Sequence, residues 1–344
     1  MTEIIKYFMR MLFGGLFFYA GIFHIVRSFY NVCGKRITIM TYHRITDRNI
    51  SEIEASLPFL FTSQEVFDKQ LKFIKKYYKV ITLKELGQCV NNNRLPWNSL
   101  IITFDDGYED NFCNAYKTLS KMNLPATFFI TVDKIDNQID KPYWWDRLYY
   151  YLKEIQKKDG EGLNKEVNTE FSDIIVKFKN NPSDLFARMN KEETGNIERL
   201  LDRIEEQYQI SNDKLLQENT MLNWEQISKM SQKCDFGSHS CSHRNLLKLD
   251  DDQKYHEIVG SKVMIEKMLD KKVPVFSCPT GHMNEEVEKF LEKGGYEFAL
   301  TTKPGINKVN GRYHLKRINI WEGTSLSLNG KFAKGYFSFK MMGF

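Results

Sequence analysis

The chain has 344 residues, of which 42% are hydrophobic, so it is long enough and apolar enough to bury a sizeable core. This composition excludes a chain that is disordered throughout. Its net charge is only +5, from 49 basic and 44 acidic side chains, and no run of five Lys or Arg occurs, so we do not expect nucleic acid to be a partner.

The N-terminal segment is the most apolar part of the chain. Between Arg10 and Arg27 lie sixteen residues without a full charge, MLFGGLFFYAGIFHIV. As a helix they would reach roughly 24 Å, short of the ~30 Å hydrocarbon core of a bilayer unless both arginines snorkel outward. No A-x-A-like site follows, which disfavours a cleaved signal peptide. We expect residues 1–33 to form a membrane-associated helix, either spanning or interfacial, and basic residues on both flanks leave its orientation open.

Strand and helix signals alternate after this segment. Ser63 is a typical N-cap for a helix in which apolar residues recur at helical spacing. The run SLIITFDDGY is apolar and β-branched and ends in two acids, as expected of a buried parallel strand. The predicted strands of this half are 37–43, 79–83, 99–104 and 126–132, with helices from 63, from 83 and over 111–122.

The second half contains an interruption and then the same alternation. Residues from about 141 to 223 are rich in Lys and Glu, carry helical patterns and show no strand signal, which predicts a helical insertion. Strand signals return in CDFGSHS, VPVFSCP and YEFALTT, separated by helices over 251–270 and 284–293. This order predicts an α/β fold, either a barrel or a doubly wound sheet, within a catalytic domain that spans 34–344.

The cysteines give no sign of a structural framework. There are six, without a CxxC pair or a regular spacing, which argues against a zinc ribbon or a disulfide network. We expect most of them to be free thiols, as in a reducing environment.

Two histidines lie four residues apart in HSCSH, at 239 and 243. On a single helical turn, His239 and His243 would share one face and could bind one cation. Two polar histidines beside a surface turn would have the same spacing. Cys241 would point away from that face, so we expect it to pack rather than to bind a metal.

Asp105 and Asp106 end a hydrophobic strand, where two carboxylates are costly unless they are neutralised or used. Adjacent residues on a strand face opposite sides, so one acid could bind a metal while the other acts as a base. The alternative is an ordinary turn, because Asp-Gly is also a common turn sequence.

Together these motifs resemble the polysaccharide deacetylases of the NodB-homology type, also called carbohydrate esterase family four. TFDDGY at 103–108 resembles the first motif of that family and HSCSH resembles its H-[ST]-x-x-H motif, with LPATFF at 124–129 between them in the family's order. The resemblance covers roughly residues 37 to 320 without the insertion. It implies a distorted (β/α) barrel.

The resemblance also implies roles for individual residues. Asp105 would be the general base, and Asp106, His239 and His243 would bind a divalent ion, usually zinc. Two imidazoles and a carboxylate leave positions open for water and for an acetyl carbonyl. A general acid would then protonate the departing amine.

The third motif departs from the family pattern. R-x-P-x-G is usual there, whereas this chain has FSCPTGHMN with Ser277 in place of the arginine. A branch of the family that includes poly-N-acetylglucosamine deacetylases also lacks that arginine. Our hypothesis is that Arg317, in HLKRINI, orients the catalytic aspartate instead; an exposed arginine at a strand end is the alternative.

The general acid is less evident, because the usual late L-x-H motif has no clear copy. In the branch just described, the acid comes from a Tyr-His pair on the first strand, and TYHRI at 41–45 matches that pattern. We therefore prefer His43 to His314 or His282. The alternative is a histidine with a structural hydrogen bond at the bottom of the barrel.

Four further residues are candidates for substrate binding. Pro279, Thr280 and Gly281 belong to the third motif, and Trp145 opens the insertion in YWWDRL. Its ring could stack on a sugar or simply pack the insertion against the barrel.

The motifs and the resemblance together predict a metal-dependent hydrolase, with zinc as the expected ion, that removes the N-acetyl group from an amino sugar of a bacterial polysaccharide or a polyprenyl-linked glycolipid. We expect it to be associated with the bacterial inner membrane. A sugar deformylase or O-acetyl esterase would use the same site, and a catalytically silent glycan-binding module is the alternative from another class.

Overall fold

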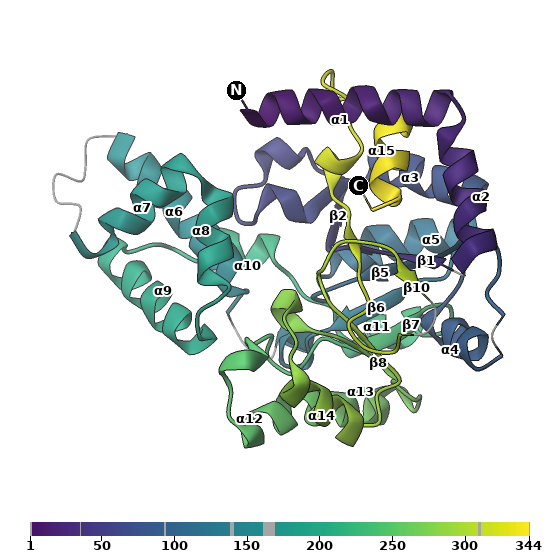
Figure 1. Ribbon diagram of the computed structural model, residues 1–344. Coiled ribbons are helices and arrows are strands. Elements are labelled where there is room, and N and C mark those ends of the chain that lie inside the picture. The colour runs from purple at the N-terminus through teal and green to yellow at the C-terminus, as the bar shows by residue number, and fades with distance from the viewer. Residues whose placement is uncertain are drawn as a thin grey trace.

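The centre of the molecule is a curled, mostly parallel sheet (Figure 1). The computed structural model describes residues 2–34, 36–92, 94–137, 141–160, 169–308 and 311–343. Over these residues the sheet has nine strands; seven follow the order β10-β1-β5-β6-β7-β8-β9, while β4 lies beside β5 and β11 beside β1. The strands are β1 (Arg36–Tyr42), β4 (Lys79–Val80), β5 (Ser99–Phe104), β6 (Thr127–Ile130), β7 (Asp235–Ser238), β8 (Val275–Ser277), β9 (Phe298–Leu300), β10 (Asn307–Lys308) and β11 (Ile318–Asn319). A two-stranded sheet pairs β2 (Arg44–Thr46) with β3 (Phe61–Ser63).

The segment 315–319 joins the two ends of the curl. Leu315 forms a parallel bridge with Leu300 of β9, and β11 pairs in parallel with Met40 and Thr41 of β1. The strands therefore form a ring in which this segment lies between β9 and β1. The arrangement confirms the predicted distorted (β/α) barrel.

Alternate residues of the strands face the inside of the barrel. These inward side chains form one buried cluster, which includes Ile39, Ile101, Phe129, Val275 and Leu300. At Gly237 of β7 a Cβ atom would lie only 2.4 Å from the ring of Phe129. The Phe129 ring thus occupies the space that a side chain at Gly237 would need. Their outward-facing neighbours belong to a larger cluster shared with the surrounding helices.

Helices surround the sheet where the sequence predicted them. The Ser63 hydroxyl accepts a hydrogen bond from the N–H of Val66, which confirms the predicted N-cap. Two of the helices contain a π-helical turn, Asn111–Tyr116 before α5 and His256–Gly260 between α12 and α13. The helices are α3 (Gln64–Tyr77), α4 (Leu83–Asn91), α5 (Lys117–Met122), α11 (Trp224–Met230), α12 (Asp251–Tyr255), α13 (Ser261–Leu269) and α14 (Glu285–Lys293).

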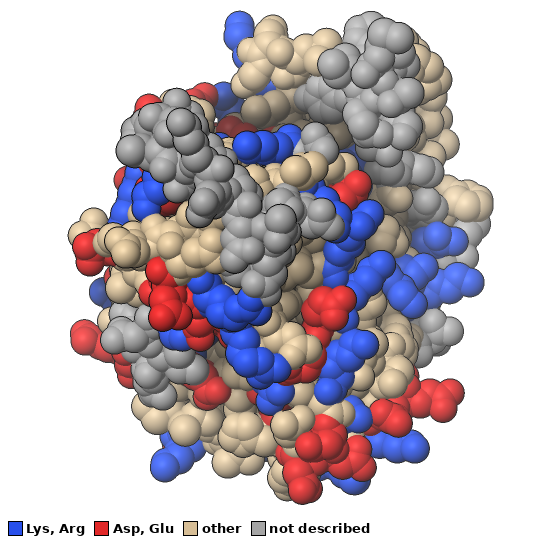
Figure 2. Space-filling view, turned by 90° about the vertical axis from the view of Figure 1, so that its left-hand side faces the viewer, with Lys and Arg blue, Asp and Glu red and all other residues tan. Residues whose placement is uncertain are grey.

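The insertion forms a helical layer on one side of the barrel, at the left of Figure 1. It consists of α6 (Trp144–Gly160), α7 (Thr169–Asn180), α8 (Pro182–Met189), α9 (Thr194–Tyr208) and α10 (Asp213–Glu218). Its aromatic residues pack into a core of their own. Residues 161–168 of the predicted insertion lie outside the described residues. Figure 2 shows this side of the molecule, where Lys, Arg, Asp and Glu are interspersed.

The apolar N-terminal segment contains two helices instead of the single one expected, α1 (Thr2–Tyr19) and α2 (Ile22–Gly34). The break lies at Gly21, whose φ of 78° is left-handed and interrupts a helix. Within the described residues, no single helix is both long and apolar enough to cross a bilayer. Met11–Tyr19 and Ile22–Phe29 together meet that test, but they are bent by 77°. The C-terminal helix α15 (Lys334–Met341) packs against α1.

Candidate active site

The candidate catalytic residues continue the inward-facing rows of the strands to the carboxyl edge of the barrel. Asp105 comes four residues after the inward-facing Ile101 of β5. His239 comes two residues after Gly237 of β7, and Arg317 comes two residues after Leu315. Because parallel strands end at a common edge, residues far apart in the chain converge there. The period of two along each strand therefore positions the site.

Asp105 is buried and forms an ion pair with Arg317. Arg317 Nη1 donates a 2.8 Å hydrogen bond to Oδ1, and Nη2 lies 2.7 Å from Oδ2. The guanidinium also donates to the carbonyl of Thr301 at 2.9 Å and to the hydroxyl of Thr41 at 3.2 Å. Burial by itself raises the pKa of Asp105, but Arg317 and His239 hold it well below its usual range. The carboxylate is therefore ionised and fixed in orientation, and the structure places Arg317 where our hypothesis requires it.

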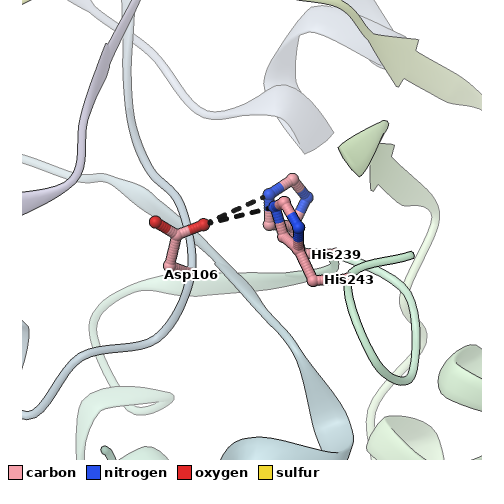
Figure 3. Close-up of side chains that lie close together, drawn as sticks. All are labelled: Asp106, His239 and His243. Carbon is pink, nitrogen blue, oxygen red and sulfur yellow. Dashed lines mark ion pairs between the residues drawn. The ribbon is translucent and has the colours of Figure 1, made fainter. Parts of the chain in front are cut away.

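The Asp106 carboxylate faces both imidazoles (Figure 3). Its Oδ1 lies 3.4 Å from His239 Nε2 and 3.7 Å from His243 Nε2. His239 Nδ1 is 2.7 Å from the carbonyl oxygen of Ser277, so this nitrogen carries the proton and Nε2 presents a lone pair. Burial, reinforced by the neighbouring His239, lowers the pKa of His243 to about 3, so this ring is neutral.

These three side chains fit a single divalent ion. Their ligand atoms all lie within 4.8 Å of one another, and all three residues are buried. Two ligands of a tetrahedral zinc ion, each about 2.0–2.1 Å from the metal, are roughly 3.4 Å apart. The two observed separations, 3.4 and 3.7 Å, are close to that value and longer than ordinary hydrogen bonds. Two imidazoles and one carboxylate are also the donors of many catalytic zinc sites.

The two histidines do not lie on a helical turn, which corrects the sequence prediction. Residues 239–243 form a loop in which Ser240 and His243 have left-handed φ values of 67° and 59°. The Ser238 hydroxyl accepts a hydrogen bond from the N–H of Ser240, and the Ser240 hydroxyl accepts one from the N–H of His243. These bonds bring the imidazoles together. Backbone conformations of this kind are costly and are typical of functional sites.

The two aspartates also differ from expectation, because they do not face opposite sides. Asp105 Oδ2 and Asp106 Oδ1 lie 4.0 and 3.4 Å from the same nitrogen of His239. The reason is the φ of 76° at Asp106, which turns its side chain back toward the inside of the barrel. The Asp-Gly turn that was the alternative interpretation is therefore present, and it is also part of the site.

Cys241 packs away from the histidine pair, as predicted. Its thiol donates a 3.3 Å hydrogen bond to the carbonyl of His256. The free thiols are Cys89, Cys113, Cys234, Cys241 and Cys278, and the side chain of Cys33 lies outside the described residues.

Of the three histidines considered as general acid, His43 lies at the site. It follows β1 and lines the same cavity as both aspartates. Its Nδ1 is buried and has no hydrogen-bond partner among the described residues. His314 pairs with a glutamate of α14 at 2.6 Å, His282 is exposed, and neither lines the cavity.

A cavity of about 590 Å³ opens over these residues. The two aspartates and the three histidines line it. Apolar residues of the loop before β3 and of the insertion also line it, and these are Leu57, Phe59, Leu60, Trp144, Trp145 and Phe186. Of the predicted substrate-binding residues, Trp145 and Thr280 line the cavity. Pro279 and Gly281 are buried in the turn after β8 and are absent from its lining.

The start of the insertion is bonded directly to the aspartate motif. The Tyr143 hydroxyl donates to the carbonyl of Asp106 at 2.7 Å, and Trp145 Nε1 donates to the hydroxyl of Tyr108 at 3.0 Å. The Trp145 ring also packs edge-on against His243, with 4.7 Å between the centroids. Trp145 therefore packs the insertion against the site, and it also lines the cavity, where it could contact a ligand.

Glu257 is a residue that sequence reasoning missed. It is buried and accepts hydrogen bonds from the N–H and the hydroxyl of Ser242, inside the histidine loop. It lies on the π-helical turn before α13. An acidic residue in a helical pattern usually reads as solvent-exposed, so the sequence carries no signal for this contact.

Comparison with known proteins identifies the family to which these motifs point. A family model described as polysaccharide deacetylase matches residues 92–299. The protein YxkH of Bacillus subtilis (strain 168) is 23% identical over 301 residues, which cover 86% of this chain and 76% of that one. The poly-β-1,6-N-acetyl-D-glucosamine N-deacetylase of Staphylococcus aureus (strain MSSA476) is 29% identical over 160 residues, 42% of this chain and only 51% of that protein. The chain thus spans about half the length of this second relative.

Among solved structures, the Streptococcus pyogenes deacetylase PplD in complex with acetate superposes with a TM-score of 0.55. Its sequence identity is 20%, and the match covers 84% of this chain and 93% of that one. At this identity the likeness shows the fold.

Proposed function

The chain belongs to the polysaccharide deacetylase family, and from that premise we propose that it is a metal-dependent enzyme that hydrolyses the N-acetyl group of an amino sugar. Membership makes it a hydrolase of acetylated carbohydrates. One observation carries the finer proposal. Asp106, His239 and His243 converge on one point, and the ionised Asp105 lies beside them in the same cavity.

Asp106, His239 and His243 would hold the divalent ion, and their donor atoms favour zinc. A bound ion would act as a Lewis acid toward the acetyl carbonyl and would lower the pKa of water. The Ser277 carbonyl keeps the His239 ring in the tautomer that exposes Nε2. The Trp145 ring packs edge-on against His243 and so supports its position.

Asp105 would act as the general base. Its Oδ2 lies 4.0 Å from His239 Nε2, which places it next to the ligand group while Arg317 holds both of its oxygens. An ionised carboxylate in this position can accept a proton from the attacking water as the oxygen adds to the acetyl carbon. The Arg317 fork fixes the direction from which the carboxylate approaches that proton.

His43 would act as the general acid. Breaking the C–N bond leaves an amine that must take up a proton, and a ring nitrogen that lines the cavity can donate it. We expect a His43→Ala variant to lose turnover and to keep its zinc affinity, because His43 is not one of the three ligands. Normal turnover in that variant would exclude this role.

The cavity supports an N-acetylated hexosamine as the substrate class. The apolar faces of a pyranose ring suit the aromatic lining residues Trp144, Trp145 and Phe186, and the aspartates and histidines of the same lining would meet the acetamido group. The Staphylococcus aureus relative is named for poly-β-1,6-N-acetyl-D-glucosamine. We therefore propose a bacterial glycan, either polymeric or linked to a polyprenyl lipid, as the substrate.

Acetate and free-amine release from polymeric and lipid-linked N-acetylhexosamine would test the proposal. The samples are the wild type, a chelator-treated protein restored with zinc, and Asp105→Asn, with Asp252→Asn on the exposed start of α12 as the matched control. We expect the wild type, the control and the zinc-restored protein to release both acetate and free amine. Asp105→Asn should release neither. Acetate without amine would indicate an O-acetyl esterase, formate would indicate a deformylase, and sugar binding without any product would indicate a silent binding module.

A further inference from the structure

Helix α1 is apolar on the face that points away from the protein. Leu12, Phe13 and Leu16 are 50%, 51% and 57% exposed, and Met9 on the same face is 42% exposed. They recur at intervals of three and four residues, which places them along one side of the helix. The outward side of a helix packed on a soluble domain is normally polar, whereas a helix that is apolar all round is normally buried in a core or in lipid.

The opposite face of α1 is fixed to the catalytic domain. At Gly14 a Cβ atom would lie 2.9 Å from the carbonyl oxygen of Gly335 in α15, and at Gly335 it would lie 2.7 Å from the carbonyl oxygen of Gly14. The two backbones therefore touch at these glycines. The rings of Phe17 and Phe339 pack edge-to-face beside this contact, 5.7 Å apart. This packing holds α1 along the top of the molecule (Figure 1).

Helix α2 shows the same division into two faces. Ile22, Ile25 and Phe29 are 43%, 68% and 58% exposed. On the inner side Phe23 is completely buried, and Arg27 donates a 2.7 Å hydrogen bond to the carbonyl of Tyr77 in α3. Both helices therefore expose apolar residues while they remain part of the folded domain.

The bend and the inner contacts argue against a spanning helix. The two apolar halves meet at 77°, and straightening them into one rod would separate Gly14 from Gly335 or Arg27 from Tyr77. The charge of the flanking sequence favours an anionic surface. Residues 1–36 carry five basic side chains and one acidic one, and residues 331–344 carry three basic side chains and no acidic one. A surface that binds a protein partner usually has a polar rim. The sixteen residues between Arg10 and Arg27 have no full charge, which argues against a protein partner at this face.

We propose that the outer faces of α1 and α2 are a membrane-docking surface that lies in the headgroup region of an anionic bilayer without crossing it. The apolar side chains enter the acyl boundary, and the basic residues of the flanking sequence, apart from the inward-facing Arg27, contact the lipid phosphates. Because α1 is packed on α15, the barrel sits directly on the lipid surface instead of swinging on a tether. This mode of attachment does not depend on which glycan is hydrolysed.

Flotation of the purified full chain with vesicles tests this surface. The vesicles contain phosphatidylcholine with or without phosphatidylglycerol, and the variant is Leu12→Glu with Leu16→Glu. The control is Val263→Glu with Met264→Glu, which are 58% and 41% exposed on α13 at the opposite end of the molecule (Figure 1). We expect the wild type and the control to bind the anionic vesicles, and the α1 variant to bind at least about tenfold more weakly. Acetate release from a short soluble chitooligosaccharide should be equal in all three proteins.

Two further results would overturn the proposal. One is a wild type that fails to bind vesicles but forms a dimer in light scattering, with the dimer lost in the α1 variant. The apolar face would then join two copies of the chain. The other comes from protein synthesised in the presence of sealed vesicles, with epitope tags at both ends. Protection of the N-terminal tag from protease while the C-terminal tag is cleaved would show a spanning helix, whereas docking leaves both tags open to cleavage.

Discussion

Arg317 binds and orients Asp105, the proposed base. Its planar fork meets both oxygens of Asp105, a geometry that a lysine ammonium cannot reproduce. We expect Arg317→Lys to reduce kcat by roughly 10²-fold, because the carboxylate keeps a counter-ion but loses its fixed orientation. Steady-state kinetics with saturating zinc measure the effect.

Zinc affinity separates this role from general damage to the site. Arg317 contacts none of the three proposed ligands, so a chelator competition should give the wild-type affinity. Arg312→Lys, at an exposed position five residues earlier, should change neither quantity. An unchanged kcat in Arg317→Lys, or a loss of zinc affinity as large as the loss of kcat, would contradict the positioning role.

Asp146 gives a prediction about stability and pH. Burial raises its pKa from an ordinary value of 3.8 to about 6, although it accepts hydrogen bonds from Ser56 and Tyr108. A carboxyl whose pKa is raised in the folded state stabilises the fold below the unfolded pKa, and that stabilisation is lost as the pH rises through about 6. The two pKa values differ by about 2.2, which corresponds to about 3 kcal/mol.

The Asp146→Asn variant does not titrate at this position. We therefore expect its free energy of unfolding, relative to the wild type, to rise by up to about 3 kcal/mol between pH 4 and pH 7. Urea denaturation at a series of pH values measures this difference, and Asp252→Asn on the surface serves as the control. A relative stability that is the same at every pH would show that Asp146 is not held in this way.

At the scale of elements, the π-helical turn between α12 and α13 supports the histidine loop. It carries Glu257, whose carboxylate accepts hydrogen bonds from both the N–H and the hydroxyl of Ser242. A glutamine can replace only part of this acceptor set. We expect Glu257→Gln to weaken zinc binding by about tenfold, because the backbone between the two proposed histidine ligands loses a constraint.

Zinc titration of the metal-free protein measures the effect directly, without relying on activity. Glu286→Gln on α14 is the matched control, since this glutamate is exposed and bonds to Lys254 well outside the histidine loop. Equal zinc affinities for the wild type and Glu257→Gln would reduce the π-helical turn to an incidental irregularity.

The elements that carry the site were predictable from sequence, whereas the conformations at their ends were not. Strand signals such as an apolar, β-branched run are local, and they located β5 and β7 and thus Asp105 and His239. The left-handed backbone at Asp106 was not predicted, because a positive φ is uncommon for any residue other than glycine, although an Asp-Gly turn was considered as an alternative. The same holds for contacts made by the fold as a whole, such as Tyr143 with Asp106, which are 37 residues apart.

At the scale of the whole molecule, the N-terminal helices and the barrel share one core. Phe23 of α2 is completely buried among the barrel-side residues Phe73 and Tyr77 of α3, with ring centroids 5.9 and 5.7 Å away. Phe337 of α15 packs edge-on against Phe73 in the same cluster. Residues 1–33 therefore share packed side chains with the domain predicted to begin at residue 34. A simple tether would share no core with that domain, and its removal would leave the barrel intact.

Two phenylalanines of α2 test this shared core. Phe23→Ala leaves a cavity where a buried ring was, so we expect the free energy of unfolding to fall by about 3–5 kcal/mol. Phe29 is 58% exposed, so Phe29→Ala should change stability by less than about 0.5 kcal/mol and should instead weaken vesicle binding. Urea denaturation measures the first effect and flotation the second. If Phe23→Ala unfolded at the same urea concentration as the wild type, α2 would be separable from the catalytic domain, and residues 1–33 would act only as an anchor.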